Sequence, residues 1–317
     1  MKKFLPVWVL LMLMPLFAWA EDAVQYDAIL SRDTYLVEEP GGRSIIRLPD
    51  REKVAVLSLG EEWSRIVYDR EVGYCKTGYL YHFVSRDPFS YPVPDRQRVT
   101  GFASFNVATE IKAGKFNGLT AQPGQVFCVM PGEEEYYRVP LWRDAARVHR
   151  AEVTYYPFAD WQSAVSGDVI GGFTTFYGEQ QGKGKAAERE HNIVLGCGRI
   201  HETVIRPDGY FSFNKLCAPY SQNNGYRYAP NISQTGFGYG GGVCQLTTTL
   251  YNAVLTLPLQ VDEWAMHRYS GIQYVPQFFD AAVGSYSDFT FQNTLPYAIR
   301  ILATPQDGIL TVLILRD

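Results

Sequence analysis

Long apolar runs are scarce in this chain. After the first twenty residues no stretch is long and apolar enough for a membrane-spanning helix, which excludes a bundle of membrane helices. Basic residues are also in short supply, because 29 Lys and Arg stand against 33 Asp and Glu, for a formal net charge of −4. A protein with an acidic balance is a poor candidate for binding a phosphate backbone, so we expect no nucleic-acid partner.

Cysteine and histidine are few, with five of each. The cysteines are Cys75, Cys128, Cys197, Cys217 and Cys244. Because five is an odd number, at least one thiol is unpaired or bonded to another chain. His191, Cys197 and His201 lie close together in the sequence, but their spacing matches no metal site well. We therefore expect no metal and no cofactor.

The first twenty residues have the features of a secretory signal peptide. Lys2 and Lys3 form a basic start, residues 4–17 are apolar, and residues 18–20 form an A-x-A cleavage site. The absence of a cysteine after this site argues against a lipoprotein. We expect export to the periplasm or cell envelope, with no stable membrane insertion after cleavage. An uncleaved anchor is the alternative.

Four further segments follow, and together they predict an α+β protein. Residues 21–85 alternate apolar runs such as "KVAVLSLG" and "WSRIVYD" with turns, which predicts a small β-barrel. In these strands the segment resembles the SH3-like domains of bacterial envelope proteins. Residues 86–97 hold three prolines and are expected to form a linker. Residues 98–165 are expected to be a β-rich insert or extension, and residues 166–317 a mixed α+β domain.

Two stretches of the last segment have helical spacing. In "KAAEREHNIVLGCGRIHETVI" one face holds Ile193, Cys197, Ile200 and Val204, which makes Cys197 a predicted core residue. In the second stretch an apolar residue recurs with helical spacing from Leu246 onward, and Pro258 ends the helix. Strands are expected from "IQYVPQFF", "DFTFQN", "YAIRILAT" and "GILTVLILR", the last two joined by a hairpin at "PQDG".

The stretch "GYGGGVCQLTTTLYNAV" places Cys244 where a glycine-rich loop becomes the second helix, which we expect to pack on antiparallel strands. The first N–H groups of a helix lack internal partners and its dipole is positive there, so both lower the pKa of a thiol. Gly241 and Gly242 let the backbone approach a substrate, and their N–H groups, with the side chain of Gln245, are candidate oxyanion donors. No Lys-Ser/Thr pair follows the glycines, which argues against a phosphate loop. A small buried hydrophobe and half of a disulfide are the structural alternatives for Cys244.

A thiolate that transfers acyl groups needs a histidine as base and then as acid. His267 follows the cysteine helix and precedes an expected strand, and Asp280 comes directly after that strand. A cysteine on a helix, followed by His and Asp on neighbouring strands, is the order of papain- and transglutaminase-like sites. Cys244, His267 and Asp280 are therefore the candidate catalytic residues, with a structural histidine and a turn-forming aspartate as alternatives.

These motifs together resemble the VanW family over about half of the chain, from Gly171 onward. The shared stretches are "FTTFY", "REHNI", "FSFN", "NGYRYAPNI", "GGGVCQLTTTLYNAVL", "YVP", "DAAV" and "DFTFQN". The sequence also departs from the family pattern, with Ala218-Pro219-Tyr220 in place of Gly-Pro-Arg, Trp264 near the usual arginine and Arg268 in place of a serine. These departures put in doubt any substrate contact made by the missing arginines.

The resemblance implies a function in the cell envelope. VanW domains of some bacteria are implicated as L,D-transpeptidases, so it implies a cysteine-dependent L,D-transpeptidase that acts on peptidoglycan stem peptides. Arg189, Asn192 and Asn214 match family motifs and either line the site or support it. The alternatives are a stem-peptide hydrolase that uses the same cysteine and a non-catalytic scaffold that binds peptidoglycan stem peptides or glycan. The sequence does not indicate an oligomeric state.

Overall fold

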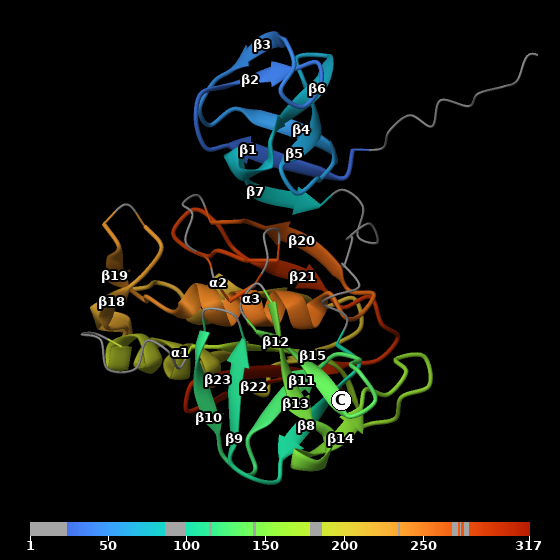
Figure 1. Ribbon diagram of the computed structural model, residues 1–317. Coiled ribbons are helices and arrows are strands. Elements are labelled where there is room, and N and C mark those ends of the chain that lie inside the picture. The colour runs from blue at the N-terminus through green and yellow to red at the C-terminus, as the bar shows by residue number, and fades with distance from the viewer. Residues whose placement is uncertain are drawn as a thin grey trace, which may run out of the picture.

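The computed structural model describes residues 24–85, 99–113, 116–141, 144–177, 186–233, 235–267, 272, 274–275 and 279–317. The expected signal peptide and the expected linker at 86–97 lie outside these residues. Strands dominate and helices are few, so the fold is mixed α+β as predicted (Figure 1). Within the described ranges, none of the helices combines the length and the apolar character needed to cross a membrane.

Seven short strands occupy the N-terminal region, where the sequence predicts a small barrel (Figure 1). They are β1 (Tyr26–Leu30), β2 (Thr34–Val37), β3 (Ser44–Leu48), β4 (Lys53–Ser58), β5 (Trp63–Tyr68), β6 (Glu71–Lys76) and β7 (Leu80–Ser85). Alternate side chains of β1 are buried, beginning with Tyr26, because successive residues of a strand point to opposite faces.

These strands do not form the expected closed barrel. Their order is β7-β1-β4-β5-β6-β2-β3, and the sheet continues beyond β7 through β20 (Gln260–Trp264) and β21 (Thr290–Gln292) to β17 (Tyr210–Ser212). The free edge of β7 is thus covered by β20, with Phe83 opposite Trp264. Alternating apolar residues predict that a segment is a strand, but they do not specify which distant strand pairs with its edge. The sequence pattern therefore could not distinguish a closed barrel from this extended sheet.

The middle region is rich in strands, as expected. Its strands are β8 (Gly101–Phe105), β9 (Thr109–Ala113), β10 (Phe116–Ala121), β11 (Val126–Val129), β12 (Tyr136–Leu141), β13 (Asp144–His149) and β14 (Val153–Pro157). They form the sheet β11-β8-β14 and two hairpins. Their apolar core includes Phe105 and Phe127 together with Phe176 and Ile309 from the C-terminal region. The middle strands therefore pack against one end of the C-terminal sheet (Figure 1).

The C-terminal region is built on an antiparallel sheet with the order β15-β23-β22-β16. Its strands are β15 (Val169–Phe176), β16 (Val204–Ile205), β22 (Ile299–Gln306) and β23 (Ile309–Arg316). Asp307 and Gly308 both have positive φ in the hairpin between β22 and β23, as the "PQDG" turn predicts. A small separate hairpin joins β18 (Tyr228–Pro230) and β19 (Phe237–Tyr239).

Three α-helices accompany this sheet among the described residues: α1 (Ala186–Ile200), α2 (Phe213–Cys217) and α3 (Val243–Val254). Helix α3 packs on β15 and β23, which confirms a cysteine helix on antiparallel strands. Cys197 is buried on α1 as predicted. The helix ends at Ile200, however, so Val204 lies in β16 and is exposed, because the chain turns at Glu202 with a positive φ.

Candidate active site

Cys244 lies at the start of α3, directly after the glycine-rich loop. It is the one cysteine of the five that is not buried, and no disulfide joins any of them. Its Sγ atom lies 3.6 Å from the carbonyl oxygen of Val283. The structure thus excludes an intramolecular disulfide and leaves this thiol within reach of solvent.

Gly242 turns the backbone into the helix. It is the N-cap residue with φ 104°, a conformation that favours glycine, and a Cβ there would lie 2.9 Å from main-chain and side-chain atoms of α1. The N–H groups of Val243 and Gln245 bond back to the carbonyls of Gly240 and Gly242. The N–H group of Cys244 has no such partner among the described residues. This N–H is therefore a donor at the mouth of the helix, where an oxyanion would form.

His267 and Asp280 are brought together by two loops. Oδ2 of Asp280 accepts hydrogen bonds from Nδ1 of His267 at 2.9 Å and from its main-chain N–H at 2.8 Å. Both side chains are buried, with 7% and 9% of their surfaces exposed. The predicted placement on neighbouring strands is wrong, because β20 ends at Trp264 and the described part of residues 272–279 is not a strand.

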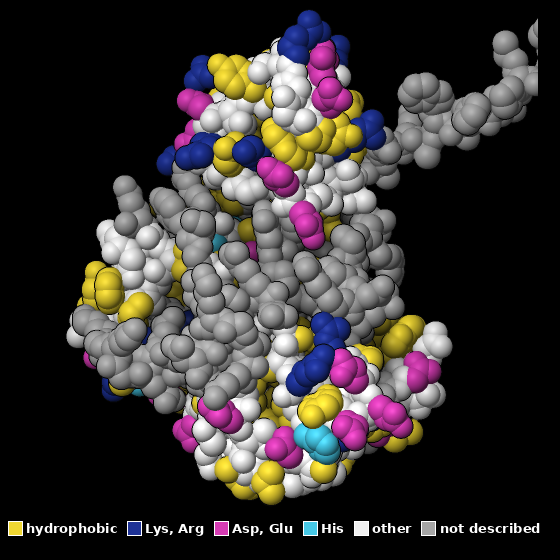
Figure 2. Space-filling view, in the orientation of Figure 1, with side chains coloured by type: hydrophobic (Ala, Val, Ile, Leu, Met, Phe, Trp, Pro, Cys, Tyr) yellow, Lys and Arg dark blue, Asp and Glu magenta, His cyan; other side chains and the backbone are white. Residues whose placement is uncertain are grey.

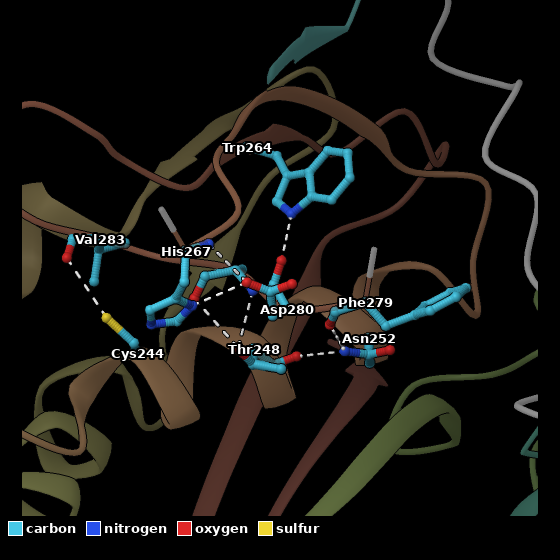
Figure 3. A network of polar contacts seen from close by, with 9 residues as sticks. Cys244, Thr248, Asn252, Trp264, His267, Phe279, Asp280 and Val283 are labelled. Atoms are coloured by element: carbon cyan, nitrogen blue, oxygen red, sulfur yellow. Dashed lines mark hydrogen bonds and ion pairs between the residues drawn. The ribbon is translucent and has the colours of Figure 1, made fainter. Parts of the chain in front are cut away.

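Charge couples Cys244 to His267. Burial alone raises the pKa of the Cys244 thiol, but the positive charge of His267 and a hydrogen bond from its side chain bring that pKa below its ordinary value. Burial alone lowers the pKa of His267, whereas the thiolate of Cys244 and the hydrogen bond to Asp280 raise it, to about 10. Each group therefore favours the charged form of the other, the thiolate and the imidazolium. Figure 3 shows the imidazole between the sulfur and the carboxylate.

Two polar side chains further along α3 hold the segment that carries the aspartate. Thr248 accepts a hydrogen bond from the N–H of Ala281 at 2.9 Å, and Asn252 donates to the carbonyl of Phe279 at 2.7 Å. Both residues share one helix face with Cys244, because they follow it at intervals of four (Figure 3). The sequence reasoning missed them, although polar residues at this spacing in "CQLTTTLYN" were the available signal.

Comparison with known proteins identifies the domain that carries this site. Residues 188–315 match the family model described as VanW like protein. Residues 188–315 are therefore a VanW domain. It is also 32% identical over 180 residues to the uncharacterized protein YoaR of Bacillus subtilis (strain 168), a match that covers 55% of this chain and 57% of YoaR. The match therefore spans little more than half of that relative. The VanW domain supports a cell-wall-related role.

Solved structures add no argument to the VanW assignment. NlpC1 from Trichomonas vaginalis aligns with 92% of this chain and 92% of its own at 10% identity, with a TM-score of 0.15. An NlpC/P60 family protein from Bacillus cereus ATCC 10987 aligns with 90% of this chain and 93% of its own at 11% identity, with a TM-score of 0.16. Scores this low indicate neither a shared fold nor a shared function.

Trp264 connects the VanW domain to the N-terminal strands. Its indole N–H donates to the main-chain oxygen of Asp280 at 2.7 Å. Its ring stacks on Phe83 of β7, at 4.7 Å between centroids, and on Tyr251 of α3, at 5.0 Å. The N-terminal region therefore contributes part of the support behind the candidate catalytic aspartate. No local pattern predicts this contact, since Phe83 and Trp264 are far apart along the chain.

Arg189 and Gln245 lie behind the nucleophile loop of the VanW domain. Arg189 is 8% exposed, and its Nη2 atom donates to Oε1 of Gln245 at 2.6 Å. Burial lowers the pKa of Arg189. The side-chain N–H groups of Gln245 donate to the hydroxyl of Thr175 and the carbonyl of Phe176, both at 3.1 Å. Because the amide of Gln245 is occupied in the interior, its side chain is not placed to donate to an oxyanion.

Asn192 and Asn214 join loops around the site. Asn192 is fully buried, and its Nδ2 donates to the carbonyls of Gly241 and Arg227 at 2.9 Å each. Nδ2 of Asn214 donates to the first and last carbonyls of the turn at 284–287, at 3.0 and 2.9 Å. Asn192 thus fixes the loop before Cys244, and Asn214 fixes the turn beyond Val283.

Two half-buried tyrosines share the electrostatic environment of Cys244. Burial, followed by the negative charge of Cys244, raises the pKa of both Tyr220 and Tyr274. Both phenols therefore stay neutral at the pH at which the thiol ionises. Tyr220 stands where the VanW pattern has an arginine, and its hydroxyl donates to Oδ1 of Asn214 at 2.6 Å.

The three residues considered for a metal site make separate contacts. Nε2 of His191 lies 3.0 Å from the carbonyl oxygen of Gly225, and Nδ1 of His201 lies 3.1 Å from that of Ala303. Cys197 is buried in the core. In the part of the chain that the structure describes, no group of three His, Cys, Asp or Glu side chains is arranged to hold a metal ion.

Proposed function

We propose that this VanW protein is a cysteine acyltransferase that acts on peptidoglycan stem peptides in the cell envelope, as an L,D-transpeptidase. The observation that carries the proposal is the pairing of a thiol at a helix start with a histidine that is fixed by a buried aspartate. The lowered pKa of Cys244 and the raised pKa of His267 supply a nucleophile and a proton donor at the same pH. Family membership supports the choice of a cell-wall substrate.

In the first half of the reaction, Cys244 becomes acylated. Its thiolate attacks the carbonyl carbon of the amide between the third residue of a stem peptide and the terminal D-amino acid. The carbonyl oxygen becomes an oxyanion, which accepts a hydrogen bond from the main-chain N–H of Cys244. As the C–N bond breaks, the His267 imidazolium gives its proton to the leaving amine. The products are a thioester on Cys244, the free D-amino acid and a neutral His267.

In the second half, the acyl group moves to an amine. Neutral His267 removes a proton from the amine of a second stem peptide as this amine attacks the thioester. The C–S bond breaks and the thiolate leaves, so the thiolate and imidazolium are restored together. Asp280 keeps the Nδ1 proton of His267 in place throughout, which leaves Nε2 to exchange protons with the reacting groups (Figure 3).

Hydrolysis is the second candidate reaction. The partial exposure of Cys244 favours it, because water can reach the thioester. If water replaces the acceptor amine, the same thioester yields a shortened stem peptide, and the protein is a stem-peptide hydrolase. The difference lies in whether an amine reaches the thioester before water does. The cysteine, histidine and aspartate have the same roles in both reactions.

Incubation of the purified protein with a disaccharide-tetrapeptide distinguishes these outcomes. Mass spectrometry should detect cross-linked dimers together with released D-amino acid, and Cys244→Ala should form neither. Shortened monomers without dimers would show that the reaction is hydrolysis and not transfer. Unchanged products with Cys244→Ala would overturn the cysteine mechanism, and no products together with an unreactive Cys244 thiol would support a non-catalytic scaffold.

A further inference from the structure

Three aromatic side chains are exposed on one face of the β18–β19 hairpin. Tyr228, Phe237 and Tyr239 are 43%, 42% and 43% exposed. Tyr228 lies opposite Tyr239, and Phe237 lies opposite Pro230, so the three rings share a face because residues two apart on a strand point the same way. The rings of Tyr228 and Phe237 are nearly parallel, at 16° with 6.1 Å between centroids. In Figure 2 apolar side chains are exposed at the left edge, where Figure 1 places this hairpin.

The other face of the hairpin is fixed to the body of the protein. Ala229 is fully buried there. Asn192 accepts a hydrogen bond from the N–H of Arg227 at 2.8 Å and donates to the carbonyls of Arg227 and Gly241. One buried side chain thus holds both the start of β18 and the loop that leads to Cys244. The aromatic face is therefore held at a set position relative to the nucleophile.

This aromatic face is too small to hold a protein partner by itself. An aromatic side chain has about 200 Å² of surface, so three rings at these exposures offer about 250 Å². A stable protein interface needs about 800 Å² from each partner. A ligand that covers only a few rings fits the available area better than a second copy of the chain does.

Polar groups at the rim indicate which kind of small ligand fits. The hydroxyl of Tyr239 donates to Oε1 of Gln222 at 3.2 Å, so an amide and a phenol hydroxyl lie beside the ring faces. A pyranose ring presents C–H groups on its face and hydroxyl or acetamido groups on its edge. The C–H face stacks on an aromatic ring, while the polar edge bonds to groups such as these. A purely apolar ligand would leave the polar rim unused.

We propose that Tyr228, Phe237 and Tyr239 form a glycan subsite that binds N-acetylated sugar rings. Through Gly240–Gly242, β19 leads directly into α3, so a sugar on this face lies on the approach to Cys244. If the proposed function holds, the glycan is the peptidoglycan strand whose stem peptide reaches the thiol. Stacking of sugars on the three rings does not itself require the thiol.

Binding to the full chain tests the subsite with two probes, N-acetylglucosamine oligomers and peptide-free glycan strands. We expect Tyr228→Ala/Phe237→Ala/Tyr239→Ala to raise the Kd at least tenfold. The matched control Tyr35→Ala/Tyr156→Ala removes rings that are 54% and 45% exposed elsewhere and should leave the Kd unchanged. Circular dichroism and the alkylation rate of Cys244 report whether each variant is folded.

A second variant separates stacking from general apolar contact and guards against unfolding. Tyr228→Leu/Tyr239→Leu retains apolar surface without flat rings, so it should lose glycan binding as well. Cys244→Ala should bind glycan like the unaltered chain. Glycan binding therefore tests the subsite separately from the proposed cysteine chemistry. Failure of the unaltered chain to bind either probe, or retention of its Kd by the aromatic variants, would overturn the subsite.

Discussion

Helices α1 and α3 each carry a cysteine, and the two thiols have opposite properties. Cys197 lies inside α1 on its apolar face and is 1% exposed, and burial raises the pKa of its thiol. Cys244 lies at the first turn of α3. Burial raises the pKa of its thiol, but the charge of His267 and the hydrogen bonds to His267 and Val283 together outweigh burial, so the pKa falls. Reactivity therefore depends on the position of a thiol relative to a helix end and to a cation, more than on the helix itself.

Removal of the two thiols should have the largest and most divergent effects. Cys244→Ala should lower the rate of product formation by at least about a thousandfold, because it deletes the nucleophile. Cys197→Ala should keep the rate and instead lower the free energy of unfolding by about 1–3 kcal/mol, because it leaves a small cavity. Muropeptide assays and urea unfolding measure the two effects. A large rate loss with Cys197→Ala at unchanged stability would contradict a purely structural role for Cys197.

Removal of the cation should make Cys244 more similar to Cys197. In His267→Ala the favourable charge is lost while burial persists, so the pKa of the Cys244 thiol should rise. We expect alkylation by iodoacetamide at pH 7 to slow by about tenfold or more, since only a small thiolate fraction then remains. Cys197 should stay unreactive in both proteins. Equal alkylation rates with and without His267 would show that the helix start alone activates the thiol.

The pH dependence of kcat/KM should show the coupled pair. The rate should rise with pH as the Cys244 thiol loses its proton below the ordinary thiol range, and it should fall as the pH passes about 10, where His267 loses the proton that it donates. The active form is therefore lost by protonation at the acidic side and by deprotonation at the alkaline side. A rate that continues to rise above pH 10 would argue against His267 as the proton donor.

A smaller effect should come from the contact between the N-terminal strands and the catalytic loops. Trp264→Phe keeps an aromatic ring but removes the N–H that holds the main-chain oxygen of Asp280. We expect kcat to fall by about tenfold with little change in KM, and the alkaline limb of the pH profile to move because His267 is less firmly held. Phe211→Leu is a buried change in the same sheet, where the ring of Phe211 stacks on Phe291, and it should lower stability without this shift.

The local parts of the site were predictable, and the non-local parts were not. Glycines before an apolar repeat predicted a helix that begins near Cys244, because that signal is contained in adjacent residues. The same reasoning missed β20, a short strand that is stabilised by pairing with β7 and β21. It also predicted a strand between His267 and Asp280, whereas the described residues of 272–279 are not part of a strand. Gln245 was predicted as an oxyanion donor, yet its amide is bonded in the interior.

The sequence by itself determined the two longer helices, the strand-rich regions, the resemblance to the VanW family and the candidate Cys, His and Asp. These depend on periodicity and on short motifs, which act over a few residues. Only the tertiary structure decided that the N-terminal strands extend into the sheet that carries Trp264. It also decided that His267 bonds to Asp280 and that three aromatic rings face solvent beside the nucleophile loop. Such contacts join residues far apart in the chain, and their geometry depends on how the folded elements pack.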